Sequence, residues 1–170
     1  FGGKWGCDSP EGCTRGRDWK AAATRIGNAI LEICPRWLIM VEGLGWGSGE
    51  CQETANTACW YGENVLGHRT SPIELSIPNR LVLSPHVYGH GTQSYMSDPT
   101  FPLNMPSVWD SLWGSMPEET GTPLVIGEWG GLWATTQAWQ QKFVSYLNNR
   151  SFGFFVWALN DNAFRVGGLY

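Results

Sequence analysis

Short runs of consecutive apolar residues alternate with helix-patterned segments along almost the whole chain. Four such runs occur, at 37–41, 81–83, 124–126 and 152–156. Strands that are apolar on both faces are typical of a parallel sheet buried between other layers. Apolar residues recur at helical spacing over 18–34 and 136–148, and a shorter helix is predicted over 106–116. The alternation predicts an α/β fold built on parallel strands.

Polar or aromatic side chains with functional potential follow each predicted strand. In parallel α/β folds the functional groups gather at the carboxyl ends of the strands, where the connecting loops converge. The sequence therefore predicts one site at a single edge of the sheet. The residues expected there, in chain order, are Glu42, His86, Tyr88, Glu128, Trp157 and Asn160.

The composition narrows the class of protein. Hydrophobic residues make up 42% of the 170 residues and charged residues 15%, which is typical of a globular chain and excludes disorder. A formal net charge of -4, with no basic stripe and no apolar run of about 20 residues, argues against nucleic acid or a membrane as partner. The 11 Trp suit a protein whose aromatic faces meet sugar rings, although a core position is the better prediction for any single Trp.

The five cysteines indicate an oxidising compartment. Cys7 and Cys13 lie close together, as do Cys51 and Cys59, so two local disulfides are expected, with free thiols as the alternative. Cys34 would be the odd thiol, buried at the end of a helix. Zinc fits poorly, because no Cys-x-x-Cys occurs and none of the three histidines lies near either pair. Because Phe1 is not an initiator Met, the natural N-terminus is expected to lie upstream.

Two strand-like segments resemble a known family. The segment 124–131, Leu-Val-Ile-Gly-Glu-Trp-Gly-Gly, resembles the nucleophile strand of glycoside hydrolase family 5, the cellulase family. The segment 79–88 is similar to the sixth strand of that family, which ends in a His and a Tyr. Further matching segments are 27–30, 37–43, 97–102 and 104–106, so the resemblance covers nearly the whole chain.

The resemblance implies a TIM (β/α)8 barrel of which residues 1–170 are a partial catalytic domain, the C-terminal half with strands five to eight, truncated at both ends. The family's Asn-Glu-Pro motif, which carries its acid/base Glu, would lie just before Phe1, and the chain would end before the final helix. The isolated fragment is expected to be inactive, and to dissolve poorly or associate, because half a barrel has two open strand edges.

The activity implied by the resemblance is hydrolysis of internal β-1,4 bonds in cellulose or related β-glucans by a retaining mechanism, without metal or organic cofactor. Glu128 would be the nucleophile, and Tyr88 with His86 would orient it or hold the sugar. Trp157 resembles the aromatic platform under the sugar that is cleaved. The segment Trp60-Tyr61-Gly62 resembles a Trp-Trp-Gly-Gly motif that lines the glycone side, with Tyr in place of the second Trp, and Asn160 is a further substrate-binding candidate.

Several residues and alternatives stay open. The aromatic residues Trp46, Trp129 and Trp133 are weaker candidates for the cleft, and Glu42 is interpreted as structural before substrate-binding. His68 and His90 have no assigned role. Because the segment after the last strand departs from the family pattern, a β-mannanase or β-1,3-glucanase is the alternative activity. A non-catalytic carbohydrate-binding protein is the alternative of another class. The parent is expected to be a secreted monomer whose partner is a β-glucan polysaccharide.

Overall fold

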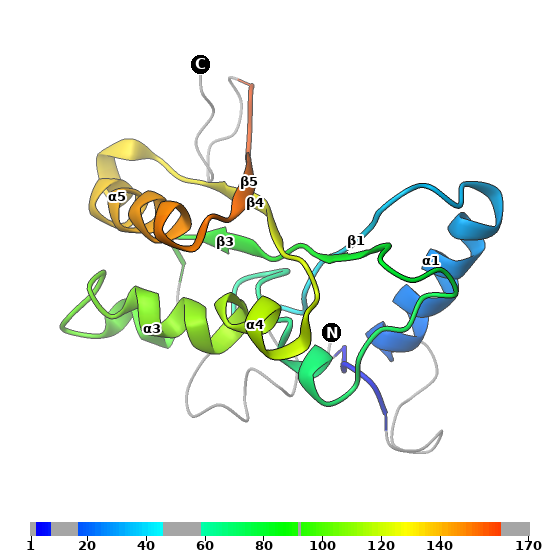
Figure 1. The fold of residues 1–170 in the computed structure, drawn as a ribbon. Coiled ribbons are helices and arrows are strands. Elements are labelled where there is room, and N and C mark those ends of the chain that lie inside the picture. The colour runs from blue at the N-terminus through cyan, green and yellow to red at the C-terminus, as the bar shows by residue number, and fades with distance from the viewer. Residues whose placement is uncertain (1–2, 8–16, 46–58, 92, 161–170) are drawn as a thin grey trace.

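A computed structural model describes residues 3–7, 17–45, 59–91 and 93–160. Parallel strands and helices follow one another along the chain, as predicted (Figure 1). The elements are α1 (Trp19–Ile33), β1 (Ile39–Val41), the 3-10 turn η1 (Leu66–Arg69), β2 (Leu81–Leu83), β3 (His86–Tyr88), the 3-10 turn η2 (Ser94–Ser97), α3 (Met105–Trp109), the π turn η3 (Asp110–Gly114), α4 (Met116–Thr120), β4 (Val125–Gly130), α5 (Trp133–Arg150) and β5 (Gly153–Val156).

The strands lie side by side in chain order, and every pairing between them is parallel. β1 pairs with β2, β3 pairs with β4, and β4 pairs with β5. β2 and β3 are two parts of one passage of the chain, separated by Ser84 and Pro85. Pro85 has no N–H to donate, so the ladder breaks there, while a bridge between Leu83 and Leu124 keeps the two parts connected. The described residues form no closed barrel.

Two strands extend further than the apolar runs predict. β4 continues from Val125 to Gly130, and β3 adds a second paired segment after the run at 81–83. Glu128 and His86 are register partners within these strands. The expectation that these polar residues follow their strands was therefore wrong in detail. Backbone pairing continues beyond the apolar side chains because each neighbouring strand supplies the hydrogen-bond partners.

Capping residues set the start of α1 and the end of α4. Asp18 caps α1 by accepting a hydrogen bond from the Ala21 backbone N–H at 3.0 Å. α5 begins three residues before the predicted 136, at Trp133. The helix predicted over 106–116 is instead the succession α3, η3 and α4, and it ends at Gly121 with φ 72°. A left-handed residue at this position favours glycine.

An aromatic cluster packs α3 and η3 against α5, which lies beside them (Figure 1). Phe143 stacks on Trp139 with ring centroids 4.8 Å apart, and Trp109 meets Phe143 edge-on at 4.9 Å. The members of this cluster are Trp109, Trp113, Trp139, Phe143 and Tyr146, all buried. The three Trp residues of this cluster are therefore core residues, the position that the sequence favoured for any single Trp.

Trp129 also belongs to the core, which corrects its assignment to the cleft. It is buried and contacts Phe143 at 5.4 Å and Phe154 at 5.6 Å between centroids. Glu128 instead lies against Tyr88 and His86, so the two adjacent side chains lie on opposite faces of β4.

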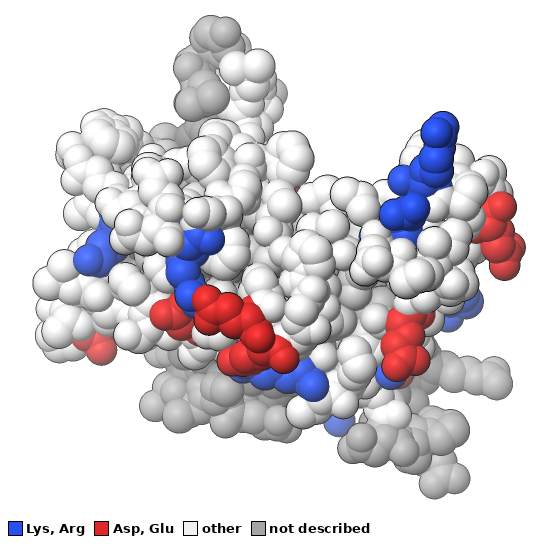
Figure 2. Space-filling view, in the orientation of Figure 1, with Lys and Arg blue, Asp and Glu red and all other residues white. Residues whose placement is uncertain are grey.

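Charged side chains are sparse on the face shown in Figure 2, where basic groups lie next to acidic ones instead of forming one continuous patch. Arg150 forms ion pairs of 2.7 Å with both Asp110 and Glu118, and Arg69 pairs with Glu119. Within the described residues no helix is long and apolar enough to cross a membrane.

The expected disulfides each include a cysteine outside the described residues, Cys13 in one pair and Cys51 in the other. Their pairing stays a prediction, although neither Cys7 nor Cys59 is a free thiol. Cys34 is free, as expected, and follows α1 directly, but it is half-buried where full burial was expected.

Candidate functional site

Glu128 on β4 is held by Tyr88 from the neighbouring strand β3. The Tyr88 hydroxyl donates a hydrogen bond of 2.9 Å to Glu128 Oε2. Tyr88 is buried, and its burial, together with the hydrogen bond and the negative charge of Glu128, raises the pKa of its hydroxyl well above the ordinary value. Tyr88 therefore stays protonated at neutral pH and can donate its hydroxyl proton to the Glu128 carboxylate. The Glu128 side chain keeps 26% of its surface exposed, enough for a ligand to reach it.

His86 lies between two carboxylates. Its Nδ1 atom is 3.5 Å from Glu128 Oε2 and 3.5 Å from Glu42 Oε1. The ring has this room because Gly127 carries no side chain, since a Cβ there would lie 3.0 Å from His86 Cδ2 and 2.3 Å from Ser84 Oγ. The sheet thus brings together four residues that the sequence placed at one edge: Glu42, His86, Tyr88 and Glu128.

A turn at Gly62 holds the backbone next to Glu42 and His86. Gly62 has φ +78°, a left-handed conformation that favours glycine, and a Cβ there would lie 2.4 Å from Glu42 Oε1. Its carbonyl accepts hydrogen bonds of 3.1 Å from the backbone N–H groups of Gly43 and His86. The turn therefore fixes the backbone beside both Glu42 and His86.

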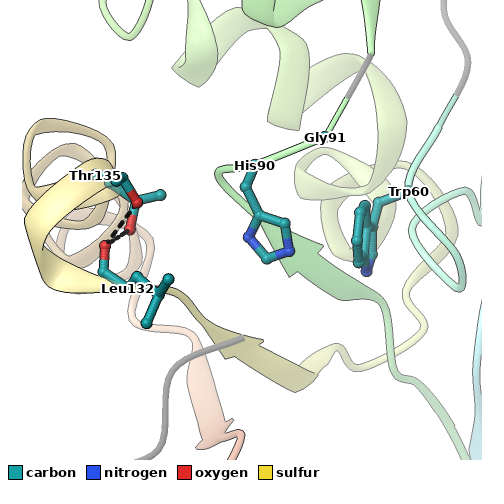
Figure 3. Close-up of a pocket in the computed structure, with 6 residues that line it drawn as sticks. Trp60, His90, Gly91, Leu132 and Thr135 are labelled. Atoms are coloured by element: carbon teal, nitrogen blue, oxygen red, sulfur yellow. Dashed lines mark hydrogen bonds between the residues drawn. The ribbon is translucent and has the colours of Figure 1, made fainter. Parts of the chain in front are cut away.

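The indole of Trp60 stands beside this group of polar residues. It contacts Tyr88 at 5.2 Å, His90 at 4.8 Å and Tyr61 at 5.7 Å between ring centroids. A pocket of about 300 Å³ opens next to it, lined by Trp60, His90, Gly91, Leu132, Thr135 and Thr136. Figure 3 shows His90 between Trp60 and the start of α5. The wall is mainly apolar, which suits a ligand with an apolar face and a few polar groups.

The remaining substrate-binding candidates lie after β5 or on the surface. The Trp157 backbone N–H donates to Trp129 O at 2.8 Å, its side chain is exposed, and the peptide to Ala158 is cis. Asn160 is exposed, as is Tyr61. Among the described contacts, no hydrogen bond or ring contact joins Trp157 or Asn160 to Glu128.

Two further cleft candidates remain, Trp46 and Trp133. Trp46 lies outside the described residues. Trp133 is exposed on the first turn of α5 and does not line the pocket. His68, which had no assigned role, is buried: its Nε2 lies 3.0 Å from Thr122 Oγ1, and its Nδ1 accepts the Ile73 backbone N–H at 3.3 Å. Burial lowers its pKa, so His68 is a neutral core histidine.

Sequence reasoning missed Glu63, a carboxylate with no exposed surface. Its Oε2 accepts hydrogen bonds from the Tyr95 hydroxyl at 2.6 Å and from the Trp60 backbone N–H at 2.9 Å. Burial raises the pKa of Glu63 to about 7 against these two hydrogen bonds, which lower it. A single Glu outside the predicted helices and strands is normally solvated, so the sequence carried no signal for this site.

Glu63 is expected to make stability fall with pH. Its pKa is 4.5 in the unfolded reference and about 7 in the fold, so the folded state binds more protons between these values. The contribution is therefore fully present below about pH 4.5 and is lost as the pH rises through about 7, by up to about 3 kcal/mol. Glu63→Gln should flatten this part of the profile, measured as the free energy of denaturant unfolding against pH.

The matched control is Glu74→Gln, because Glu74 is exposed. It should leave the slope between about pH 4.5 and 7 as in the wild type. An unchanged slope in Glu63→Gln would mean that the Glu63 carboxylate is solvated in solution.

The chain matches known proteins of one family along nearly its whole length. A family model described as Cellulase (glycosyl hydrolase family 5) matches residues 3–163. An endoglucanase of Paenibacillus polymyxa is 40% identical over 158 residues, and a major extracellular endoglucanase of Xanthomonas campestris is 38% identical over 161 residues. Each alignment covers 89% of this chain.

Solved structures agree with these matches. An endocellulase of Pyrococcus horikoshii in complex with cellotetraose has a TM-score of 0.85 at 35% identity and covers 99% of this chain. The catalytic domain of the Xanthomonas campestris endoglucanase gives 0.84 at 34% identity. The chain spans less than half of each: 39% and 32% of the two curated relatives, and 46% and 48% of the two structures.

Proposed function

The chain belongs to the cellulase family, glycosyl hydrolase family 5, and we propose that it is the C-terminal half of the catalytic domain of a secreted endo-β-1,4-glucanase. The chemistry is cleavage of internal β-1,4 bonds of cellulose or a related β-glucan with retention of configuration. The observation that carries the proposal is the Glu128 carboxylate, exposed on one side and held by Tyr88 at 2.9 Å.

The strand arrangement supports placing the chain within a TIM barrel. The strands lie in chain order with parallel pairing, as in part of a (β/α)8 barrel, and the structural relatives are about twice as long as the matched segment. The last strand, β5, is exposed along its whole length, including Phe154, Phe155 and Val156. In our proposal the first half of the barrel pairs with the open strands and covers this apolar surface.

The reaction requires two carboxyl groups with different tasks. Glu128 attacks the anomeric carbon and forms a covalent glycosyl-enzyme, while a glutamic acid from the first half protonates the leaving oxygen. The same acid, now ionised, takes a proton from water, which then releases the sugar and frees Glu128. Tyr88 holds the Glu128 carboxylate in one orientation through both steps. Neither step consumes an organic cofactor.

Aromatic and amide side chains are proposed to hold a chain of glucose units. The apolar face of a pyranose stacks on an indole, so exposed Trp157 and half-buried Trp60 are proposed as sugar platforms, with Tyr61 and Asn160 as further contacts. The Pyrococcus structure was solved with cellotetraose, which favours a β-1,4-glucan as the substrate class. The word extracellular in the name of the Xanthomonas relative supports secretion.

The proposal is tested with the full-length protein that contains this chain. Reducing ends are measured on carboxymethyl-cellulose, barley glucan, laminarin and mannan. The fastest release is expected on carboxymethyl-cellulose or barley glucan. Preferential cleavage of mannan or laminarin would assign the alternative activities, and sugar binding without hydrolysis by a folded protein would make the chain part of a carbohydrate-binding protein.

Tyr88→Phe is expected to lower kcat by about 10- to 100-fold, because the Glu128 carboxylate loses the donor that orients it. The matched control is Tyr146→Phe, which removes a similar hydrogen bond, from a Tyr hydroxyl to Asp110 Oδ1 at 2.6 Å, within the aromatic cluster. The control should keep kcat within about twofold, measured under saturating carboxymethyl-cellulose. Equal kcat values in the two variants would contradict the orienting role of Tyr88.

A further inference from the structure

Glu63 connects two segments that are distant in the sequence. From the turn at 60–63 it receives the Trp60 backbone N–H, and its own N–H returns a hydrogen bond of 3.1 Å to Trp60 O, so the turn is closed by a reciprocal pair. From the η2 segment it receives the Tyr95 hydroxyl. Asn104 Nδ2 donates to Tyr95 O at 2.8 Å and thereby ties η2 to the start of α3. The Oε2 atom of Glu63 thus joins the turn at 60–63 to the η2 segment.

The turn that Glu63 closes carries the aromatic wall of the pocket. Trp60 is its first residue, and the indole contacts both His90, which also lines the pocket, and Tyr88, which donates to Glu128. The next two residues are the exposed Tyr61 and Gly62, whose carbonyl holds the backbone of His86. Any shift of this turn would move Trp60 relative to the pocket.

A fully buried carboxylate is a costly means of stabilising a loop. Its ionised form is desolvated, and its Oε1 atom has no hydrogen-bond partner among the residues that the structure describes. Apolar residues of similar volume often stabilise a fold as well as buried charged groups do. What a carboxylate adds is direction, because Oε2 accepts two donors from two segments at defined angles.

We propose that Glu63 is a positioning residue: through its hydrogen bonds to Trp60 and Tyr95, it sets the indole of Trp60 as the wall of a pocket that binds one sugar ring of the β-glucan chain. This rests on the proposed glucanase function, which includes Trp60 as a sugar platform, and adds to it the residue that fixes the position of that platform. Glu63 touches no substrate, and its effect passes through Trp60.

The test compares variants of the full-length protein in steady-state hydrolysis of cellotetraose and cellopentaose. Glu63→Ala leaves the two donors without an acceptor, whereas Glu63→Gln keeps an amide oxygen in the place of Oε2. Tyr95→Phe removes one donor with little change of volume, and Trp60→Ala removes the wall itself. Thermal unfolding is recorded for each variant, and kinetics are measured at least 15 °C below the lowest midpoint.

The expected result is a KM raised about tenfold in Glu63→Ala and in Trp60→Ala, with kcat changed less than about threefold. Glu63→Gln should leave KM within about 1.5-fold of the wild type, and Tyr95→Phe should raise it about threefold. If Glu63→Ala fails to fold, Tyr95→Phe and Glu63→Gln decide the matter, because the proposal requires the first to raise KM more than the second.

Three outcomes overturn the proposal. A lowered unfolding midpoint with unchanged KM in Glu63→Ala or Tyr95→Phe makes Glu63 purely structural. An unchanged KM in Trp60→Ala shows that the wall binds no sugar. Equal KM values in Glu63→Gln and Glu63→Ala would show that the hydrogen bonds accepted by Glu63 do not position Trp60. Hydrolysis by the wild type is measured first. If the folded wild-type protein cleaves no β-glucan, the proposed glucanase function is refuted, and the variants are not needed to show it.

Discussion

Replacement of Glu128 by Gln should lower kcat on carboxymethyl-cellulose by a factor of at least about 10³. An amide oxygen cannot form the glycosyl-enzyme, since it lacks the negative charge that makes the carboxylate a nucleophile. The fold should be retained, because Gln has the same shape and its oxygen can still accept the Tyr88 hydroxyl. Initial rates of reducing-end release at saturating substrate provide the measurement, with circular dichroism as the check on folding.

Glu42→Gln is the matched control for this experiment. Glu42 carries the same side chain and lies at the same distance of 3.5 Å from His86 Nδ1, but it is more exposed and receives no hydrogen bond from Tyr88. Replacement of the Glu42 carboxylate should lower kcat by less than about tenfold, because it changes only the position of His86. If Glu42→Gln lost as much activity as Glu128→Gln, the nucleophile could not be assigned to Glu128. Activity surviving in Glu128→Gln would refute that assignment directly.

The second large effect concerns stability. Trp109→Ala should lower the free energy of unfolding by about 3–5 kcal/mol, because Trp109 is fully buried and a cavity would remain where its ring now contacts Trp139, Phe143 and Tyr146. The aromatic contacts add to the loss of buried area. Denaturant unfolding of the full-length protein, followed by circular dichroism, gives the measurement.

Trp133→Ala removes the same side chain from an exposed position. Trp133 keeps 55% of its surface accessible, so its loss should change the free energy of unfolding by less than about 1 kcal/mol. A small effect of Trp109→Ala, similar to that of Trp133→Ala, would mean that α3 and α5 do not pack through the aromatic cluster.

Several features of this chain could be predicted without coordinates. Apolar runs at 81–83 and 124–126 predicted neighbouring parallel strands, and the pairing of Leu83 with Leu124 and of His86 with Glu128 confirms them. Because parallel strands end at the same edge, the grouping of His86, Tyr88 and Glu128 followed from their places after these runs. Composition also favoured Trp in the core, where Trp109 lies.

Tertiary structure alone decided which face each aromatic residue presents and how far each polar group is desolvated. Trp129 was a candidate for the cleft, but its ring is buried against Phe143 of α5, a contact that the sequence does not reveal. Glu63 lies outside the predicted helices and strands, and in the fold it is buried and bonded to Tyr95, 32 positions away.

The physical reason for this division is the range of the interactions. Backbone periodicity and strand direction depend on neighbouring residues and can be read locally. Burial, and with it the pKa of Glu63 and the position of Trp60, depends on which distant segments pack together. The sequence by itself therefore determined the parallel α/β order and the edge that carries Glu128, and only the tertiary structure decided the wall of the pocket and the carboxylate that holds it.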